Sequence, residues 1–202
     1  MASRRRLGIV SGVLGVLIVG AAVVLAPPVE RRARASLVVA LDLPTMVERA
    51  DHVAVVDVAT VNAAWDDKHE RILTTIDLSV VEAWKGPMAP SSHVKIVQPG
   101  GAVGDIQMTV FGMSHFSPGE RALVFLRGEP TAASVVGMAQ GKRLVRRDTA
   151  TGRWMVHAPE RAGASFVLAP GTSRAPVFES RLRGLDDLRA EVRGLVVKPS
   201  GK

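Results

Sequence analysis

The sequence of 202 residues contains no cysteine. This excludes a disulfide framework, a thiolate nucleophile and a metal site built from thiolates. Tyrosine is absent as well, and aromatic residues make up only 4% of the chain. Modules that bind nucleic acid often stack bases on aromatic side chains placed among basic ones. The composition therefore argues against nucleic acid as a partner.

The positive charge of the chain is unevenly distributed. Of the net charge of +7, residues 1–35 contribute five units through six arginines and one glutamate. Residues 36–120 hold 5 basic and 11 acidic side chains, whereas residues 121–202 hold 15 basic and 7 acidic ones. Such an asymmetry can steer an acidic partner toward the C-terminal part of the chain.

Residues 1–35 predict export to the periplasm or the cell exterior. Three arginines at positions 4–6 precede an apolar run over residues 7–26, which is the pattern of a secretory signal peptide. A small-x-small cleavage pattern at residues 33–35 makes Ser36 the expected mature N-terminus. The apolar run of about 20 residues is also long enough to span a bilayer, so an uncleaved membrane anchor is the alternative. The arginines fit either an ordinary signal or a twin-arginine signal.

The mature chain reads mainly as strands. Asp42 is the expected N-cap of a short helix over residues 43–50. Residues 52–65 are rich in valine, and residues 71–84 alternate between apolar and polar side chains. The polar residues 66–70 between them predict a hairpin loop.

The alternation in the second of these strands slips at Val80 and Val81, which predicts a β-bulge. Long strands that bend at a bulge are typical of a small closed barrel. Residues 121–127 are apolar through their middle, which predicts a strand buried on both faces. Further strands are expected at residues 92–98, 106–111, 134–139 and 153–157.

The spacing of apolar residues changes in the C-terminal part of the chain. Residues 159–180 are rich in proline, glycine and alanine and read as a loop, whereas apolar residues recur at helical spacing over residues 181–196. We therefore expect a mainly β fold: a small OB-like antiparallel barrel over residues 36–158, a short N-terminal helix and a C-terminal amphipathic helix packed on the barrel. The solvated face of that helix is expected to carry the arginines at positions 181, 183, 189 and 193.

A glycine cluster at Gly100, Gly101 and Gly104 resembles a phosphate-binding loop only superficially. A dinucleotide fingerprint opens a helix, and a Walker loop ends in Gly-Lys-Ser or Gly-Lys-Thr. Here the next residues alternate like a strand instead. The cluster therefore predicts a turn over residues 99–104, and whether that turn also forms one lip of a binding surface stays open.

The sequence predicts no catalytic, cofactor-binding or metal-binding residue. The histidines do not fall at the spacing of helical metal motifs, and the nucleophile motif Gly-x-Ser-x-Gly is absent. The densest local cluster places His69 beside Asp66, Asp67 and Glu70, and a solvated hairpin tip explains it as well as a cation site does. The five histidines are His52, His69, His93, His115 and His157.

Two charged features stand out within the strands. Asp57 interrupts the valine run, so we expect it to face outward or to lie at a bulge. Lys142 and Arg143, with Arg146 and Arg147, form the densest basic patch of the mature chain. This patch reads as a solvated strand face or as a contact for an acidic protein or an anionic envelope surface.

Residues 49–142 resemble a family of uncharacterised exported bacterial proteins. The resemblance rests on ADHVAVVDV, VVEAWKG, QPGGAVGDIQMTVFG, HFSPGERALVFL and VVGMAQGK in this order. Asp57 departs from the family pattern, which has a glycine there. The resemblance implies export and a β-rich domain, and the family has no established activity. More loosely, the chain is similar to the OB-type barrels of netrin-like and metalloproteinase-inhibitor domains, whose cysteine-based mechanism does not apply here.

The expected function is binding rather than catalysis. We expect an exported binding or inhibitor-like domain whose partner is a protein or an anionic envelope component, without cofactor, metal or nucleic acid. Contact with a membrane is expected only through the N-terminal segment. The alternative is a small envelope hydrolase with its site near His115 and Glu120.

Overall fold

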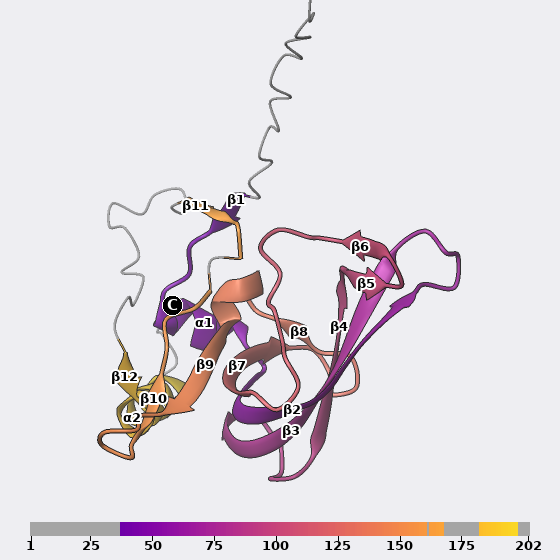
Figure 1. Ribbon diagram of the computed structural model, residues 1–202. Helices are drawn as coiled ribbons and strands as arrows, with labels where there is room; N and C mark the ends of the chain where they lie inside the picture. Colours follow the sequence, from indigo (N-terminus) through magenta and orange to yellow (C-terminus); the bar gives the residue numbers. More distant parts are fainter. Residues whose placement is uncertain (1–36, 161, 168–181, 198–202) are drawn as a thin grey trace, which may run out of the picture. The chain divides into compact units, whose positions relative to one another are not determined.

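The computed structural model describes residues 37–160, 162–167 and 182–197 (Figure 1). Two predicted segments lie outside these ranges. They are the signal or anchor over residues 1–35 and the part of the predicted loop over residues 168–180. Within the described ranges, no helix is both long enough and apolar enough to cross a membrane.

The chain is mainly β with two α-helices, as the sequence predicted. The helices are α1 (Leu43–Arg49) and α2 (Leu185–Val197), and a 3-10 turn covers Met138–Gly141. The strands are β1 (Leu37–Val39), β2 (His52–Trp65), β3 (Ile72–Lys85), β4 (His93–Pro99), β5 (Gly101–Val103), β6 (Ile106–Met108), β7 (Arg121–Arg127), β8 (Ser134–Val135), β9 (Lys142–Arg147), β10 (Trp154–Val156), β11 (Ser165–Val167) and β12 (Arg183–Gly184).

The main sheet has the strand order β12-β10-β9-β7-β2-β3-β4, with β8 paired to β7. Strands β2, β3 and β4 follow one another, and β7 returns beside β2, which is a Greek key. The strand ladders leave this sheet open. A single parallel bridge between Ile96 of β4 and Ala133, just before β8, joins its two sides into a ring, although strand ladders do not close it as the predicted barrel. At this bridge, the Ala133 N–H donates to the Lys95 carbonyl over 2.9 Å.

The long hairpin of β2 and β3 carries the predicted bulge. Val55 pairs with Glu82 and Val56 pairs with Val80, so the ladder skips Val81. This extra residue reverses the side-chain phase of β3. Val80 therefore faces the barrel interior, whereas Trp84 faces the helices.

Two apolar cores lie on the two faces of the sheet. The barrel interior contains Val56, Ile76, Leu78, Val94, Ile96 and Val124, and the layer beneath the helices contains Met46, Val53, Phe125, Leu188 and Val192. Strand β7 contributes to both, because Val124 points into the barrel and Phe125 points toward the helices. The prediction that residues 121–127 are buried on both faces is confirmed.

Strand β3 fastens both helices to the sheet. The Lys85 ammonium donates to the carbonyls of Val47 (2.7 Å) and Ala50 (2.6 Å) at the end of α1, where helical carbonyls lack partners. Glu82 pairs with Arg189 (2.8 Å) and Arg193 (3.1 Å) of α2. Arg189 is half-buried and anchors the helix, so a solvated position was wrong for it, whereas Arg193 is exposed as expected and pairs with Glu82 from the surface.

Two predicted strands are half as long as expected or shorter. Residues 106–111 do not cross the barrel, since β6 ends at Met108 and pairs only with β5. β5 and β6 form a separate two-stranded sheet, and Ile106 is 54% exposed. Residues 134–139 form β8 over two residues only, because Gly137 adopts a positive φ of 67° and starts the 3-10 turn.

Candidate functional site

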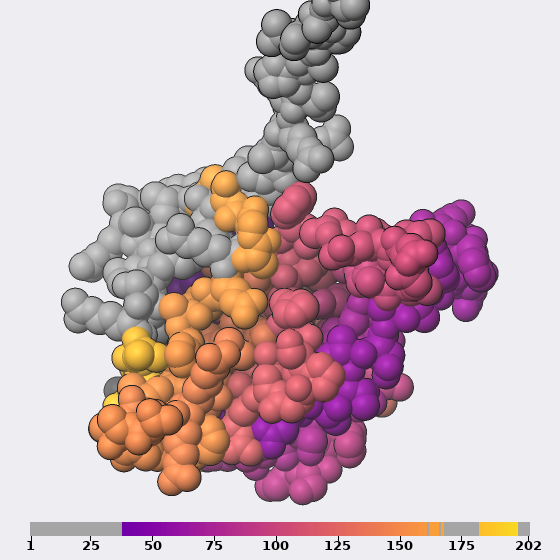
Figure 2. Space-filling model, in the orientation of Figure 1, coloured from indigo at the N-terminus to yellow at the C-terminus, as the bar shows by residue number. Residues whose placement is uncertain are grey.

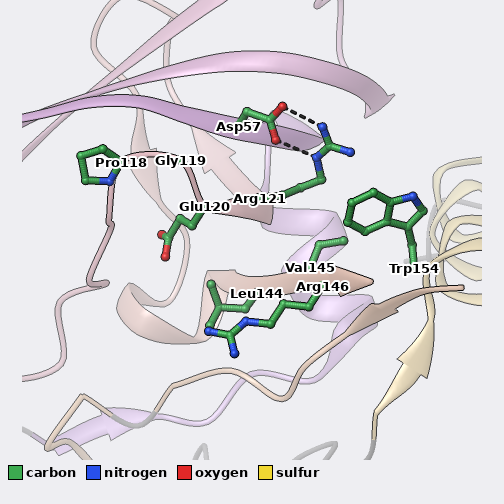
Figure 3. Close-up of a pocket in the computed structure, with 9 residues that line it drawn as sticks. All are labelled: Asp57, Pro118, Gly119, Glu120, Arg121, Leu144, Val145, Arg146 and Trp154. Carbon is green, nitrogen blue, oxygen red and sulfur yellow. Dashed lines mark hydrogen bonds and ion pairs between the residues drawn. The ribbon is translucent and has the colours of Figure 1, made fainter. Parts of the chain in front are cut away.

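A pocket of about 610 Å³ opens beside the sheet beyond the last pair of the β7–β9 ladder, which joins Ala122 to Leu144 (Figure 3). It is lined from β2, from the turn before β7, from the first residue of β7, from β9 and from β10. The lining residues are Asp57, Pro118, Gly119, Glu120, Arg121, Leu144, Val145, Arg146 and Trp154.

Asp57 and Arg121 form a bidentate ion pair in this pocket. They occupy facing positions of β2 and β7, and Arg121 donates from Nε (2.6 Å) and from Nη2 (2.7 Å) to the two carboxylate oxygens. The hydrogen bonds to the Asp57 carboxylate raise the pKa of Arg121 above its usual value. Asp57 points away from the barrel interior, so the expected outward position is confirmed, and its charge is neutralised by Arg121.

Trp154 lies against this ion pair. Its indole ring is 4.8 Å from the Arg121 guanidinium, a cation–π distance, and the residue remains 39% exposed. Figure 3 shows the ring beside the guanidinium at the edge of the pocket. Because Arg121 is itself held by Asp57, its contact with Trp154 favours this position of the indole.

Lys142 forms a second ion pair behind the pocket. Only 2% of the residue is exposed, and its Nζ lies 2.7 Å from the Glu120 carboxylate. The same ammonium donates to the His115 carbonyl and lies 4.9 Å from the Phe116 ring. A buried ammonium requires such partners, because it has lost its hydration.

The predicted basic patch is therefore divided into buried and exposed side chains. Lys142 and Arg143 are buried, at 2% and 4% exposure, so for them a solvated strand face was wrong. Arg147 is exposed and donates from Nε to the Gly152 carbonyl. Arg146 is exposed on the rim of the pocket, and its side chain makes no hydrogen bond or ion pair with any residue in the described ranges.

His115 and Glu120 line two different pockets. Glu120 borders the pocket of Figure 3, whereas His115 borders a separate groove on the other side of the segment over residues 109–120. A histidine and a carboxylate do meet elsewhere, where His93 Nδ1 lies 3.4 Å from Asp77 in a shallow pocket. The side chain of His93 is 67% exposed there, so that pair is solvated.

The hairpin cluster around His69 organises the turn itself. Asp66 accepts from the backbone N–H of Glu70 (2.8 Å) and from Nε of Arg71 (3.1 Å), and the first of these bonds is the main reason why the pKa of Asp66 is lowered. His69 stacks on Trp65 with ring centres 6.0 Å apart. Across the described part of the chain, no three histidine, aspartate or glutamate residues come together as a metal site.

The glycine cluster reverses the chain, but not as the predicted single turn over residues 99–104: Gly100 separates β4 from β5, Gly101 begins β5, and Gly104 begins the turn into β6. Gly101 has a positive φ of 128°, and a Cβ there would lie 2.5 Å from Thr74 Oγ1. The Thr74 hydroxyl donates to the Gly100 carbonyl, which fixes the turn on β3. The chain continues into the β5–β6 hairpin rather than a helix. Gly100, Gly101 and Ala102 also border the groove that contains His115, so this turn does form one lip of a concave surface.

Comparison of the chain with known protein families, curated proteins and solved structures found no match. The resemblance of residues 49–142 to a family of exported bacterial proteins therefore stays a prediction.

Proposed function

We propose that this protein is an exported, non-catalytic binding domain that holds an acidic segment of a partner protein in the pocket of Figure 3. The observation that carries the proposal is Arg146, whose side chain has no ion-pair partner among the described residues and which lines the same pocket as the exposed Trp154. Figure 3 shows the Arg146 guanidinium on the Leu144 side of the pocket and the indole at its opposite edge. The other charges that meet there are balanced, since Asp57 pairs with Arg121 and Glu120 pairs with Lys142. One positive charge is thus left for a partner.

The combination of an exposed tryptophan and an arginine without a counter-ion in the pocket suits protein recognition. Tryptophan and arginine are enriched among the residues that dominate binding energy at interfaces. A carboxylate on Arg146 would be matched by apolar contact on Trp154, whose position is favoured by its contact with Arg121. The surplus of basic residues after position 120 would steer an acidic partner toward this side.

Catalysis is supported less well than binding. The two carboxylates of the pocket are held in ion pairs, and His115, the histidine of the hydrolase hypothesis, lines another groove. These ion pairs and the position of His115 therefore support non-catalytic binding better than a hydrolase centred on His115 and Glu120. Export remains part of the proposal because residues 1–35 have the pattern of a secretory signal peptide.

The test is affinity capture of partners from a native envelope extract. We expect Arg146→Glu and Trp154→Ala each to weaken capture by about tenfold or more, which corresponds to about 1.4 kcal/mol. Arg127→Glu is the matched control, because Arg127 is an exposed arginine at the far end of β7 and does not line this pocket. Added salt should weaken capture by the wild type, since the contact is ionic and close to the surface.

Two results would count against the proposal. Equal loss of capture in Arg127→Glu and Arg146→Glu would mean that net charge matters and the pocket does not. Capture of an anionic polysaccharide or lipid in place of an acidic protein would assign the site to an envelope component.

A further inference from the structure

A groove of about 510 Å³ lies between the barrel and the segment over residues 109–116, apart from the pocket of Figure 3. Its lining comes from β2, β3, the end of β4, the β5–β6 hairpin and that segment. Figure 2 shows the β5–β6 hairpin lying over the ends of β2 and β3. Apolar side chains form most of its walls, among them Val61, Ile76, Met108, Val110, Met113 and Phe116.

The polar side chains of the groove mainly hold its walls together. Gln98 donates to the Ser114 carbonyl (2.7 Å), and the Ser114 hydroxyl donates to the Met138 carbonyl (3.1 Å). Thr74 donates to the Gly100 carbonyl. These bonds fix the segment to β4 and the turn to β3, so the walls of the groove are already in place without a ligand.

The lining of the groove is poor in charge. None of the described residues that line it is an aspartate, glutamate, lysine or arginine. A charged ligand would lose hydration there without gaining an ion-pair partner, which is costly. An apolar molecule would gain the free energy of burial against the aliphatic and methionine side chains. The volume falls within the usual range of small-molecule sites, which are often found at the mouths of β-barrels.

We infer that this groove is a second binding site, specific for an uncharged and largely apolar small molecule. The inference does not depend on the acidic partner of the other pocket. It assigns a role to the QPGG turn, which forms one lip, and to the Met108 and Met113 side chains, which can adapt to the shape of a ligand.

The test uses the neutral hydrophobic dye Nile red, followed by its fluorescence with the full exported protein. We expect saturable binding to the wild type, and an affinity lower by about tenfold or more in Ala102→Phe, which places a large side chain at the exposed lip. Ala64→Phe is the control, since Ala64 is equally exposed on β2 and does not line the groove. Arg146→Glu should bind the dye like the wild type, which separates this site from the acidic-partner pocket.

A second pair of variants tests the inference if Ala102→Phe does not fold. Val110→Asp puts an unpaired charge into the groove and should also abolish dye binding, whereas Val97→Asp on the exposed face of β4 should not. Displacement of the dye by 1-decanol is expected at concentrations about tenfold lower than by decanoate, because a carboxylate must keep its hydration. Absence of saturable binding to the wild type, equal binding by all variants, or stronger displacement by decanoate would overturn the inference.

Discussion

Gln140, Gly141 and Lys142 are adjacent residues with separate structural roles. The Gln140 side chain, 1% exposed, accepts from the Leu41 N–H (2.8 Å) and donates to the Val39 carbonyl (3.0 Å). A Cβ on Gly141 would lie 2.1 Å from the Val136 carbonyl oxygen, so only glycine fits. The fold therefore explains why glutamine, glycine and lysine follow one another in the VVGMAQGK segment, and these residues do not by themselves indicate an activity.

The ion pair of Lys142 and Glu120 gives a prediction at this scale. Glu120→Gln removes the nearer of two carboxylates from a buried ammonium and leaves only Glu160, whose Oε1 lies 4.0 Å from Nζ; we expect a loss of about 3 kcal/mol in the free energy of unfolding. Lys142→Met should cost less, about 1 to 2 kcal/mol, because the Glu120 side chain is 18% exposed and keeps some hydration. Urea denaturation of both variants and of the double variant measures these losses and their coupling.

Glu129→Gln serves as the control, since Glu129 is exposed and away from the pair. It should change the free energy of unfolding by less than about 0.5 kcal/mol. If Glu120→Gln were as mild as this control, the pair would contribute nothing to stability.

At the scale of single elements, α1 shows how a local sequence pattern determines structure. Asp42 caps the helix by accepting from the Thr45 N–H over 2.9 Å, as predicted from the order of residues alone. The hydroxyl and the N–H of Thr45 both donate to this carboxylate and lower the pKa of Asp42 below its ordinary value.

This cap makes part of the stability depend on pH. Because the pKa of Asp42 is lower in the folded protein, its stabilisation is present above the pKa of the unfolded chain, near 4, and is lost as the pH falls through the folded value. An asparagine side chain at this position would cap the helix without titrating. In thermal unfolding from about pH 6 to pH 2, we expect the wild type to lose more stability than Asp42→Asn. Parallel curves for the two proteins would contradict this.

The same scale shows what the sequence could and could not predict. The bulge at Val81, the hairpin over residues 66–70 and both helices follow from local periodicity, and all were found. The shortened β6 was missed, because alternation does not reveal whether a strand has a neighbour to pair with. The Asp57–Arg121–Trp154 arrangement was missed as well. It depends on pairings between strands that lie far apart in the sequence, and only the interruption of a valine run by Asp57 hinted at it.

For the whole molecule, the predicted barrel depends on a short closure. The β2–β3–β4–β7 sheet is joined through single residues at Ile96 and Ala133, and the long β2–β3 hairpin forms its longest ladder. Hydrophobic periodicity predicted the strands of this ring, but a bridge of one residue carries no sequence signal. The overall class could therefore be predicted, and the way the ring closes could not.

Export gives the prediction that belongs to the whole chain. Mass spectrometry of the protein isolated from its native envelope should find Ser36 as the first residue, because residues 33–35 match a signal cleavage pattern. A variant with Ala35→Arg, which removes one small residue of that pattern, should be cleaved poorly. Recovery of the wild type with residues 7–26 still attached would show that this segment is an anchor.

The position of Lys142 has a consequence for both proposed sites. Its ammonium contacts His115, which borders the apolar groove, and Glu120, which borders the acidic-partner pocket. A ligand that displaces this shared segment from one side must therefore alter the other side. Such heterotropic coupling is reciprocal: the factor by which the apolar molecule changes the affinity for the partner equals the factor by which the partner changes the affinity for the molecule.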